Sequence, residues 1–444
     1  MSKRIFTNIC WRRKITQFFV ACFFIFGLSD GARTQIISSD AVLREHISRA
    51  FEKNPGLGEI RNRITASEQQ VSQAGVWKDP TIGVSLMSLA VNSFDFNQEP
   101  MTGAWISVGQ MIPLSNKLDL RTEIAEDNLA TKEVTLRSRK LMIAESLTKT
   151  WYHWAFLREA LSTLDNNIEL IDNLIVIARS KYETGKGMQQ DILRAETKRS
   201  QLEDKRSNLH QMILTTSRKF AILTGNEPDD IPSTPESLPD IFLQIIVNDM
   251  EETLFKKNPM WLKSNIELAM ASRKVELARR SVIPDLKLGA AYGFRQDADN
   301  GMERPDLLTI SAGMSLPIHR DKRQNAAVRQ MTANHRAIVF KQNALELELK
   351  FQLQSLIDQD DRLAEQIVLN IESIEPLSEA TLASSTNSYS IGKADFEAIL
   401  MAESNLFNTR LDRLARIRDR LQVRASLAAL VGGDDLLPAK NTTN

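Results

Sequence analysis

Histidine, cysteine and paired carboxylates are the residues that most often catalyse reactions or bind metals in proteins. In this chain none of them has the spacing that such a site requires. The histidines occur singly, without the short spacings of metal ligands, at His46, His153, His210, His319 and His335. We find no Gly-rich phosphate loop, no nucleophile elbow and no carboxylate pair placed for acid–base catalysis. The sequence therefore predicts that the protein is not an enzyme and uses no metal or cofactor.

The start of the chain has the pattern of a targeting segment. Five basic residues precede an apolar stretch over 15–28, which is too short to cross a membrane as a mature helix. We expect a signal peptide over residues 1–31, cleaved near Ala32; the alternative is an N-terminal anchor helix. Cys22 stands in a weak lipobox, so a lipid-anchored N-terminus is a second alternative. Signal-peptide cleavage would also remove Cys10, which excludes disulfides and Cys nucleophiles from the mature chain.

The charge balance gives no indication of a nucleic-acid partner. Lys plus Arg number 56 and so do Asp plus Glu, whereas a chain that binds phosphate backbones normally has a basic excess. Gly and Pro are sparse and charged residues make up 25% of the chain, a composition typical of long solvated helices.

The second half of the chain repeats the first. Three motifs recur 204 residues later: Asn54-Pro55 as Asn258-Pro259, Pro80 as Pro284, and Ile112-Pro113 as Leu316-Pro317. Three more recur 207 residues later: Tyr182-x-x-Gly185 as Tyr389-x-x-Gly392, Ile192–Glu196 as Ile399–Glu403, and Leu223-Thr224-Gly225 as Leu430-Val431-Gly432. We infer one duplicated unit of about 200 residues, far too long for a solenoid repeat.

Alternation of apolar with small or polar residues predicts two strands in each unit. We place the strands at residues 81–90, 103–112, 285–294 and 307–316. About ten residues is the length of a tilted strand that crosses a bilayer with its apolar face toward lipid. Trp105, Tyr292 and Phe294 lie at the loop ends of these strands, where an aromatic girdle is expected. The alternative is an ordinary half-buried hairpin of a soluble protein.

A very long helical hairpin follows the strands in each unit. Residues 115–181 contain no Gly or Pro, and their apolar residues recur at helical spacing. We place the hairpins at 115–224 and 321–430, with turns at Gly185 and Gly392. Pro376 interrupts the outgoing helix of the second hairpin and is expected to kink it.

The predicted elements divide the chain into five segments. These are a signal peptide (1–31), a first repeat (32–228), a Pro-rich connector (229–241), a second repeat (242–433) and a flexible tail (434–444).

One chain cannot complete the predicted membrane structure. Four strands cannot close a barrel, and open sheet edges are not tolerated in lipid. Three copies would supply twelve strands, an even number within the usual range for membrane barrels. The long helices also need partners from other copies, so we expect them to form a shared tube.

The element order, the duplication, the Asn-Pro pairs and the Tyr-x-x-Gly turns resemble the TolC family of outer-membrane efflux proteins. The resemblance covers about residues 40–433 and implies a mainly α fold with transmembrane β structure. In such a fold, helical hairpins form a periplasmic tube, and each chain of a homotrimer gives four strands to a 12-strand outer-membrane barrel. Residues 185–193 are similar to members paired with metal-exporting pumps.

The resemblance also implies partners and a function. A periplasmic adaptor (membrane fusion) protein docks at the helix tips and joins the channel to an inner-membrane pump of RND or ABC type. The channel gives passive exit across periplasm and outer membrane, in efflux or type I secretion, with metal cations or drugs as candidate substrates. The alternatives are a periplasmic adaptor or a structural coiled-coil protein of the cell envelope, and the four alternating strands argue against both.

By resemblance, the gate lies at the turns between the long helices. Asp191 and Tyr389 match positions at which family members link the two hairpins through a hydroxyl and a carboxylate. The family's basic partner corresponds to Ala394, and Lys393 is the nearest base. The alternative role for Asp191 is to cap the returning helix.

Other residues near the turns are candidates for ion selection and docking. In a trimer, Asp395 and Glu397 would form a ring of carboxylates at the entrance that favours cations; the alternative is plain solvated charges. Family members that carry such acids have them where this chain has Ala398 and Met401. The resemblance assigns adaptor docking to the turns themselves, while the alternative role of their glycines is only a positive φ. The candidate docking residues are Thr184, Gly185, Lys186, Ile391 and Gly392.

Overall fold

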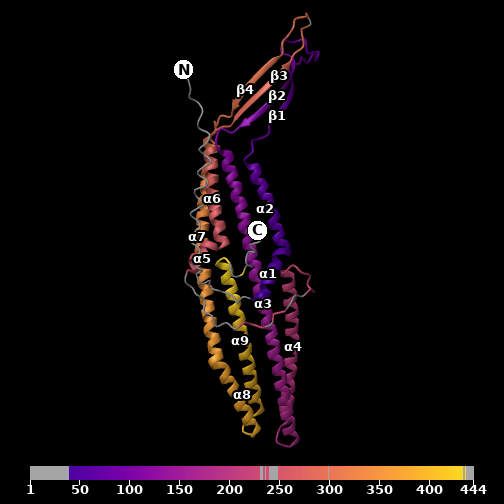
Figure 1. The fold of residues 1–444 in the computed structure, drawn as a ribbon, viewed down its shortest axis with the longest axis vertical. Coiled ribbons are helices and arrows are strands. Elements are labelled where there is room, and N and C mark those ends of the chain that lie inside the picture. Colours follow the sequence, from indigo (N-terminus) through magenta and orange to yellow (C-terminus); the bar gives the residue numbers. More distant parts are fainter. Residues whose placement is uncertain are drawn as a thin grey trace, which may run out of the picture.

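The computed structural model describes residues 40–230, 234–235, 237–239, 249–298, 300–433 and 436. The expected signal peptide, both cysteines, much of the connector and all but one residue of the predicted tail lie outside these residues. The strands lie at one end of a long helical body, and the turns between long helices lie at the other end (Figure 1).

The first unit contains two short helices, two strands and a long helical hairpin. Its elements are α1 (Ala41–Lys53), α2 (Pro55–Ala74), β1 (Thr81–Met87), β2 (Gly103–Ile112), α3 (Lys117–Glu183) and α4 (Gln189–Leu223). The helix α3 has 67 residues and runs from the sheet to the tip. The second unit has the same order, which confirms the duplicated, mainly helical fold.

The elements of the second unit are α5 (Met250–Lys257), α6 (Pro259–Arg280), β3 (Leu286–Phe294), β4 (Leu307–Met314), η1 (Asp321–Asn325), α7 (Ala326–Leu369), η2 (Asn370–Ile374), α8 (Glu375–Ser390) and α9 (Phe396–Leu430). The strands β1 and β4 end a few residues before the limits expected from the alternation. No helix in the described ranges combines the length and the apolar character needed to cross a membrane.

Two π-helical turns distinguish the outgoing helix of the second unit. A π turn closes over i→i+5 and so takes in one residue more than an α turn. Both η1 and η2 lie between the motifs where the repeat offset grows by three residues, and they can accommodate two of the three. Pro376 lies in the first turn of α8, which begins directly after η2, and the chain changes direction between α7 and α8 (Figure 1).

The repeated Asn-Pro forms the joint between the two short helices of each unit. Asn54 ends α1, and its side chain accepts a hydrogen bond of 2.9 Å from the N–H of Gly56. Pro55 begins α2, where its fixed φ suits the first helical position. Asn258 caps α6 in the same way, accepting from the N–H of Met260 at 2.8 Å. One residue therefore both stops one helix and starts the next.

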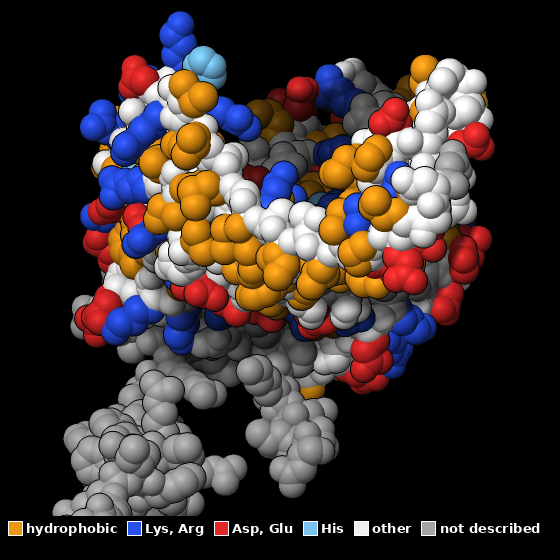
Figure 2. All heavy atoms as spheres, turned by 90° about the horizontal axis from the view of Figure 1, so that it is seen from above, with side chains coloured by type: hydrophobic (Ala, Val, Ile, Leu, Met, Phe, Trp, Pro, Cys, Tyr) orange, Lys and Arg blue, Asp and Glu red, His pale blue; other side chains and the backbone are white. Residues whose placement is uncertain are grey.

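The four described strands form one antiparallel sheet in the order β1-β2-β3-β4. The register aligns apolar side chains on one face, in the row Ile82, Val108, Ala290 and Ile310. This face is open, because Ile82 is 78% and Ile310 80% exposed. The opposite face carries small residues, as in the row Gly83, Ser107, Ala291 and Thr309. Seen from the sheet end, hydrophobic side chains form a band along the sheet (Figure 2).

The placement of Trp105 in the outward-facing girdle is wrong. Trp105 lies opposite Gly293 in the register, on the face of small residues. It is only 7% exposed, and a Cβ added at Gly293 would lie 2.6 Å from its ring. Tyr292 and Phe294 do belong to the exposed aromatic face, where their rings are 4.8 Å apart.

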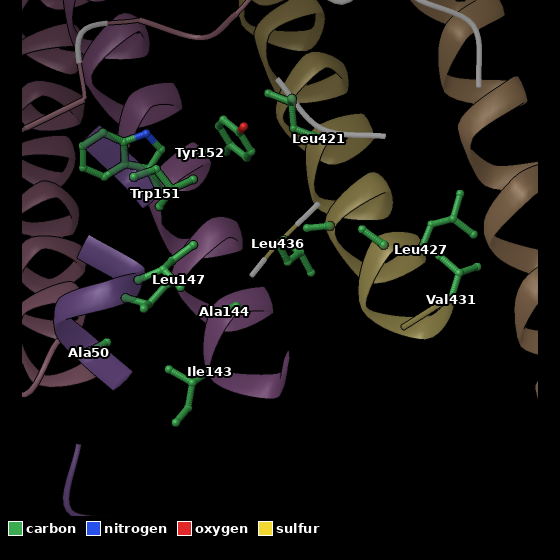
Figure 3. Close-up of a cluster of buried hydrophobic side chains, with 14 of the residues drawn as sticks. Ala50, Ile143, Ala144, Leu147, Trp151, Tyr152, Leu421, Leu427, Val431 and Leu436 are labelled. Atoms are coloured by element: carbon green, nitrogen blue, oxygen red, sulfur yellow. The ribbon is translucent and has the colours of Figure 1, made fainter. Parts of the chain in front are cut away.

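Two hydrophobic cores hold the helices together. The larger core includes Trp151 and Leu147 of α3, on the side of Ala50 of α1, and Leu427 of α9 on its other side (Figure 3). Leu436, the one described residue of the predicted tail, is buried in this core. The second core lies near the tips and joins the two hairpins, with members from α3, α4, α8 and α9. The tip is therefore packed as one body, which brings the candidate residues of both hairpins together.

Candidate functional site

The two turns at the tips have the same backbone pattern. The N–H of Gly185 bonds to the carbonyl oxygen of Tyr182 at 3.0 Å, and that of Lys186 bonds to Lys181 at 2.9 Å. This pair of bonds is a Schellman motif, and the second turn repeats it around Gly392. Gly185 and Gly392 have φ of 71° and 75°, the left-handed region that favours glycine. The repeated Tyr-x-x-Gly is thus first of all a helix stop.

All five candidate docking residues, Thr184, Gly185, Lys186, Ile391 and Gly392, are exposed on these turns. Ile391 is 67% exposed and adds an apolar side chain to the surface of the second turn. A Cβ built on Gly185 or Gly392 meets no atom within 4 Å, so the surface there is open.

Asp191 and Tyr389 lie together although they come from different hairpins. The Tyr389 hydroxyl donates to Asp191 Oδ2 at 3.3 Å, and each residue is 6% exposed. The distance is long for an O–H···O bond, so the link is weak. Burial, together with the charge of Asp191, raises the pKa of Tyr389 to about 12, so the hydroxyl stays protonated and able to donate to a higher pH than that of a free tyrosine. Asp191 also lies in the first turn of α4, where a carboxylate is favoured by the helix dipole.

Lys181 is a third member of this contact that the sequence did not reveal. Its Nζ lies 3.9 Å from the centroid of the Tyr389 ring and donates a hydrogen bond to the Tyr389 carbonyl oxygen. The cation therefore binds both the ring face and the C-terminal end of α8, where the helix dipole favours positive charge. Phe396 covers another side of the ring, with centroids 5.3 Å apart.

The expected base, Lys393, does not take part. Its side chain is exposed and makes no hydrogen bond or ion pair with any described residue. Asp395 precedes α9 as its N-cap residue, yet its side chain makes no capping bond, and it is also exposed. Lys181, from the other hairpin, supplies the positive charge beside Tyr389 instead.

Glu397 is paired across the two hairpins. Arg194 Nη1 of α4 lies 2.7 Å from Glu397 Oε2 of α9. One turn further along, Lys198 Nζ donates to Ser404 Oγ at 2.5 Å and lies 3.4 Å from the buried Glu403. Since Arg194 offsets its charge, Glu397 adds less to an acidic entrance than the sequence suggested.

A groove of about 590 Å³ runs between α4 and α9 at these contacts. Arg194, Lys198 and Glu397 line it, with the apolar Leu193 and Met401 on its rims, 56% and 62% exposed. Within the described ranges, no three His, Cys, Asp or Glu side chains come together to hold a metal. The groove therefore lies beside the polar pairs that join the two hairpins.

The three basic residues that bridge the hairpins share a sequence signal that was overlooked. The repeat offset of 207 matches Lys181 to Ser388, Arg194 to Met401, and Lys198 to Asn405. Each base is therefore unique to the first unit, while its acceptors lie on the second. Comparing the units for charges that fail to recur would have found all three.

The chain has the fold of solved outer-membrane channel proteins. It is similar to VceC from Vibrio cholerae, with a TM-score of 0.75 and 18% identity over 89% of this chain and 97% of VceC. It is also similar to the channel OprN, with a TM-score of 0.78 and 15% identity over 91% of this chain and 92% of OprN. The MtrE channel of Neisseria gonorrhoeae in its open state gives a TM-score of 0.74 at 13% identity, over 91% of this chain and 94% of MtrE.

The chain belongs to the outer membrane efflux protein family, whose model matches residues 46–226 and 252–433. The two matched segments correspond to the two units. OpmQ of Pseudomonas putida, a pyoverdine export outer membrane protein, is 21% identical over 273 residues, which are 62% of this chain and 56% of OpmQ. The protein is therefore a transport protein of the outer membrane and not an enzyme.

Proposed function

We propose that three copies of this chain form a passive channel-tunnel of a tripartite efflux or type I secretion system. The sheet carries the proposal. Its apolar residues are in register on one exposed face, and β1 and β4 are edge strands within the described chain. In lipid each edge needs a partner strand. The edge β1 of one copy is the natural partner for β4 of the next, and three copies close a barrel of twelve strands.

The helices support the same assembly. On α7, Phe340, Leu347 and Phe351 are 71%, 70% and 68% exposed. Their spacing of seven and four residues places them on one face of the helix. A second copy packed on this face would remove the three side chains from water, as a shared helical tube requires.

The turns at the tip are the proposed docking site for a periplasmic adaptor. The exposed side chain of Ile391 and the open backbone at Gly185 and Gly392 offer a surface without steric obstruction. The adaptor would connect the tube to an inner-membrane pump of RND or ABC type, which supplies the energy. The name of OpmQ adds pyoverdine to the candidate cargoes, beside the metal cations and drugs expected from the sequence.

The contacts between Asp191, Tyr389 and Lys181 are the proposed closure of the tube. They join hairpin one to hairpin two through weak polar bonds. A docked partner can replace these bonds with its own contacts to the same residues. Asp395 would remain at the entrance as the unpaired acid of a cation-selective ring, and Glu397 would join it when Arg194 is displaced.

Membrane fractionation tests this function against the other readings. A channel-tunnel predicts a trimer in the outer-membrane fraction that dissociates to the single-chain mass only on heating in detergent. A soluble monomer, or a protein found with the inner membrane, would contradict the channel and favour a coiled-coil or adaptor protein.

A further inference from the structure

The two loops at the far end of the sheet, one from each unit, are tied together by arginines. The loop over 88–102 joins β1 to β2, and the loop over 295–306, of which 295–298 and 300–306 are described, joins β3 to β4. Arg304 Nη1 donates to the carbonyl oxygens of Asn97 and Glu99, each at 3.2 Å. The bonds thus run from the second loop to the backbone of the first.

Arg295 makes a second bridge at the base of the loops. Its Nη1 donates to the carbonyl oxygen of Pro100 at 3.3 Å, and its Nε donates to that of Pro305 at 2.8 Å. One guanidinium therefore holds a carbonyl from each loop, which its planar fork of donors allows.

The second loop is itself braced, so the arginines are held in place. Asp306 accepts from the Tyr292 hydroxyl at 2.7 Å and from the N–H of Arg295 at 3.0 Å. The N–H of Arg304 donates to Asp297 Oδ1 at 2.9 Å. These bonds fix both ends of the loop before it meets its neighbour.

The sheet is filled on its small-residue face where these loops begin. Thr102 is 1% exposed and its hydroxyl donates to the Ser88 carbonyl oxygen at 2.6 Å, which draws the ends of the first loop together. Trp105 lies close by with its ring over Gly293. In the middle of the sheet this face bears small side chains such as Ser107 and Ala291, and Met111 and Lys287 lie on it toward the opposite end.

We propose that the loops over 88–102 and 295–306 act as one outer lid on each copy, and that Arg295 and Arg304 clasp it. The proposal rests on the proposed function, in which the small-residue face lines the barrel. Three such lids narrow the outer mouth, at the opposite end of the molecule from the helix tips. The clasp joins the two units, so the lid opens only when the loops separate.

The test compares the full-length protein with a variant that carries Arg295→Gln and Arg304→Gln. Glu303→Gln on the same loop is the control, because the Glu303 side chain makes no bond with any described residue. Chymotrypsin cleavage after Phe94, which is 66% exposed on the first loop, reports loop opening. Losing these charge-assisted bonds should speed that cleavage roughly three- to tenfold, and the control should not change it.

Single-channel conductance in planar bilayers is the second readout. The double variant should conduct more than the unchanged protein and the control. One outcome is that the unchanged protein conducts while the double variant has the same cleavage rate and the same conductance. That result would contradict the lid proposal and leave the proposed channel function intact. If cleavage quickens without any rise in conductance, the loops are clasped but do not narrow the mouth, and the proposal is wrong. If the unchanged protein forms no channels, the proposed function falls, and the lid with it.

Discussion

Tyr389 is held by hairpin one from two directions, and these contacts set how firmly the tip is closed. Asp191 accepts from its hydroxyl, while Lys181 lies over its ring and binds its carbonyl oxygen. The hydroxyl bond, at 3.3 Å, contributes about 1 kcal/mol or less. The cation over this buried ring adds about 1–2 kcal/mol. In each copy these two contacts together stabilise the closed tip by only a small free energy. The binding of a partner at the tip can therefore offset them.

Replacing Tyr389 by Phe should raise the single-channel conductance. The ring and its contact with Lys181 remain, so only the bond to Asp191 is lost. Tyr182→Phe is the matched control, because Tyr182 is the equivalent residue of the first unit and is 47% exposed. Equal conductance of the Tyr389 variant and the unchanged protein would remove the Asp191 link from the gate.

The gate should also respond to alkaline pH through Tyr389. Its pKa is raised from 10.0 to about 12, mainly by burial and also by Asp191. A group with a raised pKa stabilises the buried state fully below pH 10, and that contribution is lost as the pH rises toward 12. We expect open probability to increase over this interval in the unchanged protein and to change less in Tyr389→Phe. The variant keeps every lysine, so a response caused by lysine titration would remain in it. Identical profiles would therefore show that ionisation of Tyr389 does not open the gate.

At the scale of elements, sequence periodicity predicted most of the fold. The strands appear wherever the alternation has period two, and α3 appears as one helix because nothing between 115 and 181 breaks it. The repeat located the Asn-Pro joints and both tip glycines, since each has a local backbone role. The face of Trp105 was also predictable, because Ile106 and Val108 fix the parity of β2 and leave Trp105 on the opposite face.

The tip contacts were only partly predictable, because they depend on how two hairpins pack. Asp191 and Tyr389 were chosen by resemblance, and the structure places them in contact. Lys181 was missed, since no local pattern tells that a lysine in the last turn of α3 reaches α8. The positions of the π turns were also not predictable, because an extra residue in a helix changes the sequence pattern only through the repeat offset.

The two Asn-Pro joints give a matched pair of stability variants. Asn258 caps α6 and its Nδ2 also donates to the Leu430 carbonyl oxygen at 2.8 Å, whereas Asn54 only caps α2. Asn54→Ala should cost about 1 kcal/mol, and Asn258→Ala about 2 kcal/mol because a second bond is lost. Thermal unfolding followed by circular dichroism measures both. Equal losses would mean that the bond to Leu430 contributes nothing.

At the scale of the whole molecule, duplication has a physical reason. One unit leaves its strands and long helices without partners, and two units still leave both sheet edges and the apolar stripe of α7 exposed. The two hairpins are not identical, because the π turns and the unmatched bases occur in one unit each. The difference places the three bridging bases on hairpin one and their acceptors on hairpin two, and the proposed gate depends on this asymmetry.

The closed trimeric barrel is tested most directly by disulfides between sheet edges. Within one copy, β1 and β4 are separated by two strands, which places them roughly 14 Å apart and far beyond disulfide reach. A cysteine at Gly83 of β1 can therefore pair only with a cysteine on β4 of another copy. Ser311→Cys and Gly313→Cys sample two registers on the same face, in a chain whose own cysteines are replaced.

The account predicts that Gly83→Cys combined with one of the two β4 substitutions gives covalent dimers and trimers on a non-reducing gel of outer membranes. Each single substitution should give no trimer. Double variants that reach the outer membrane but stay monomeric on the gel, in both registers and under oxidant, would contradict the closed barrel of three copies.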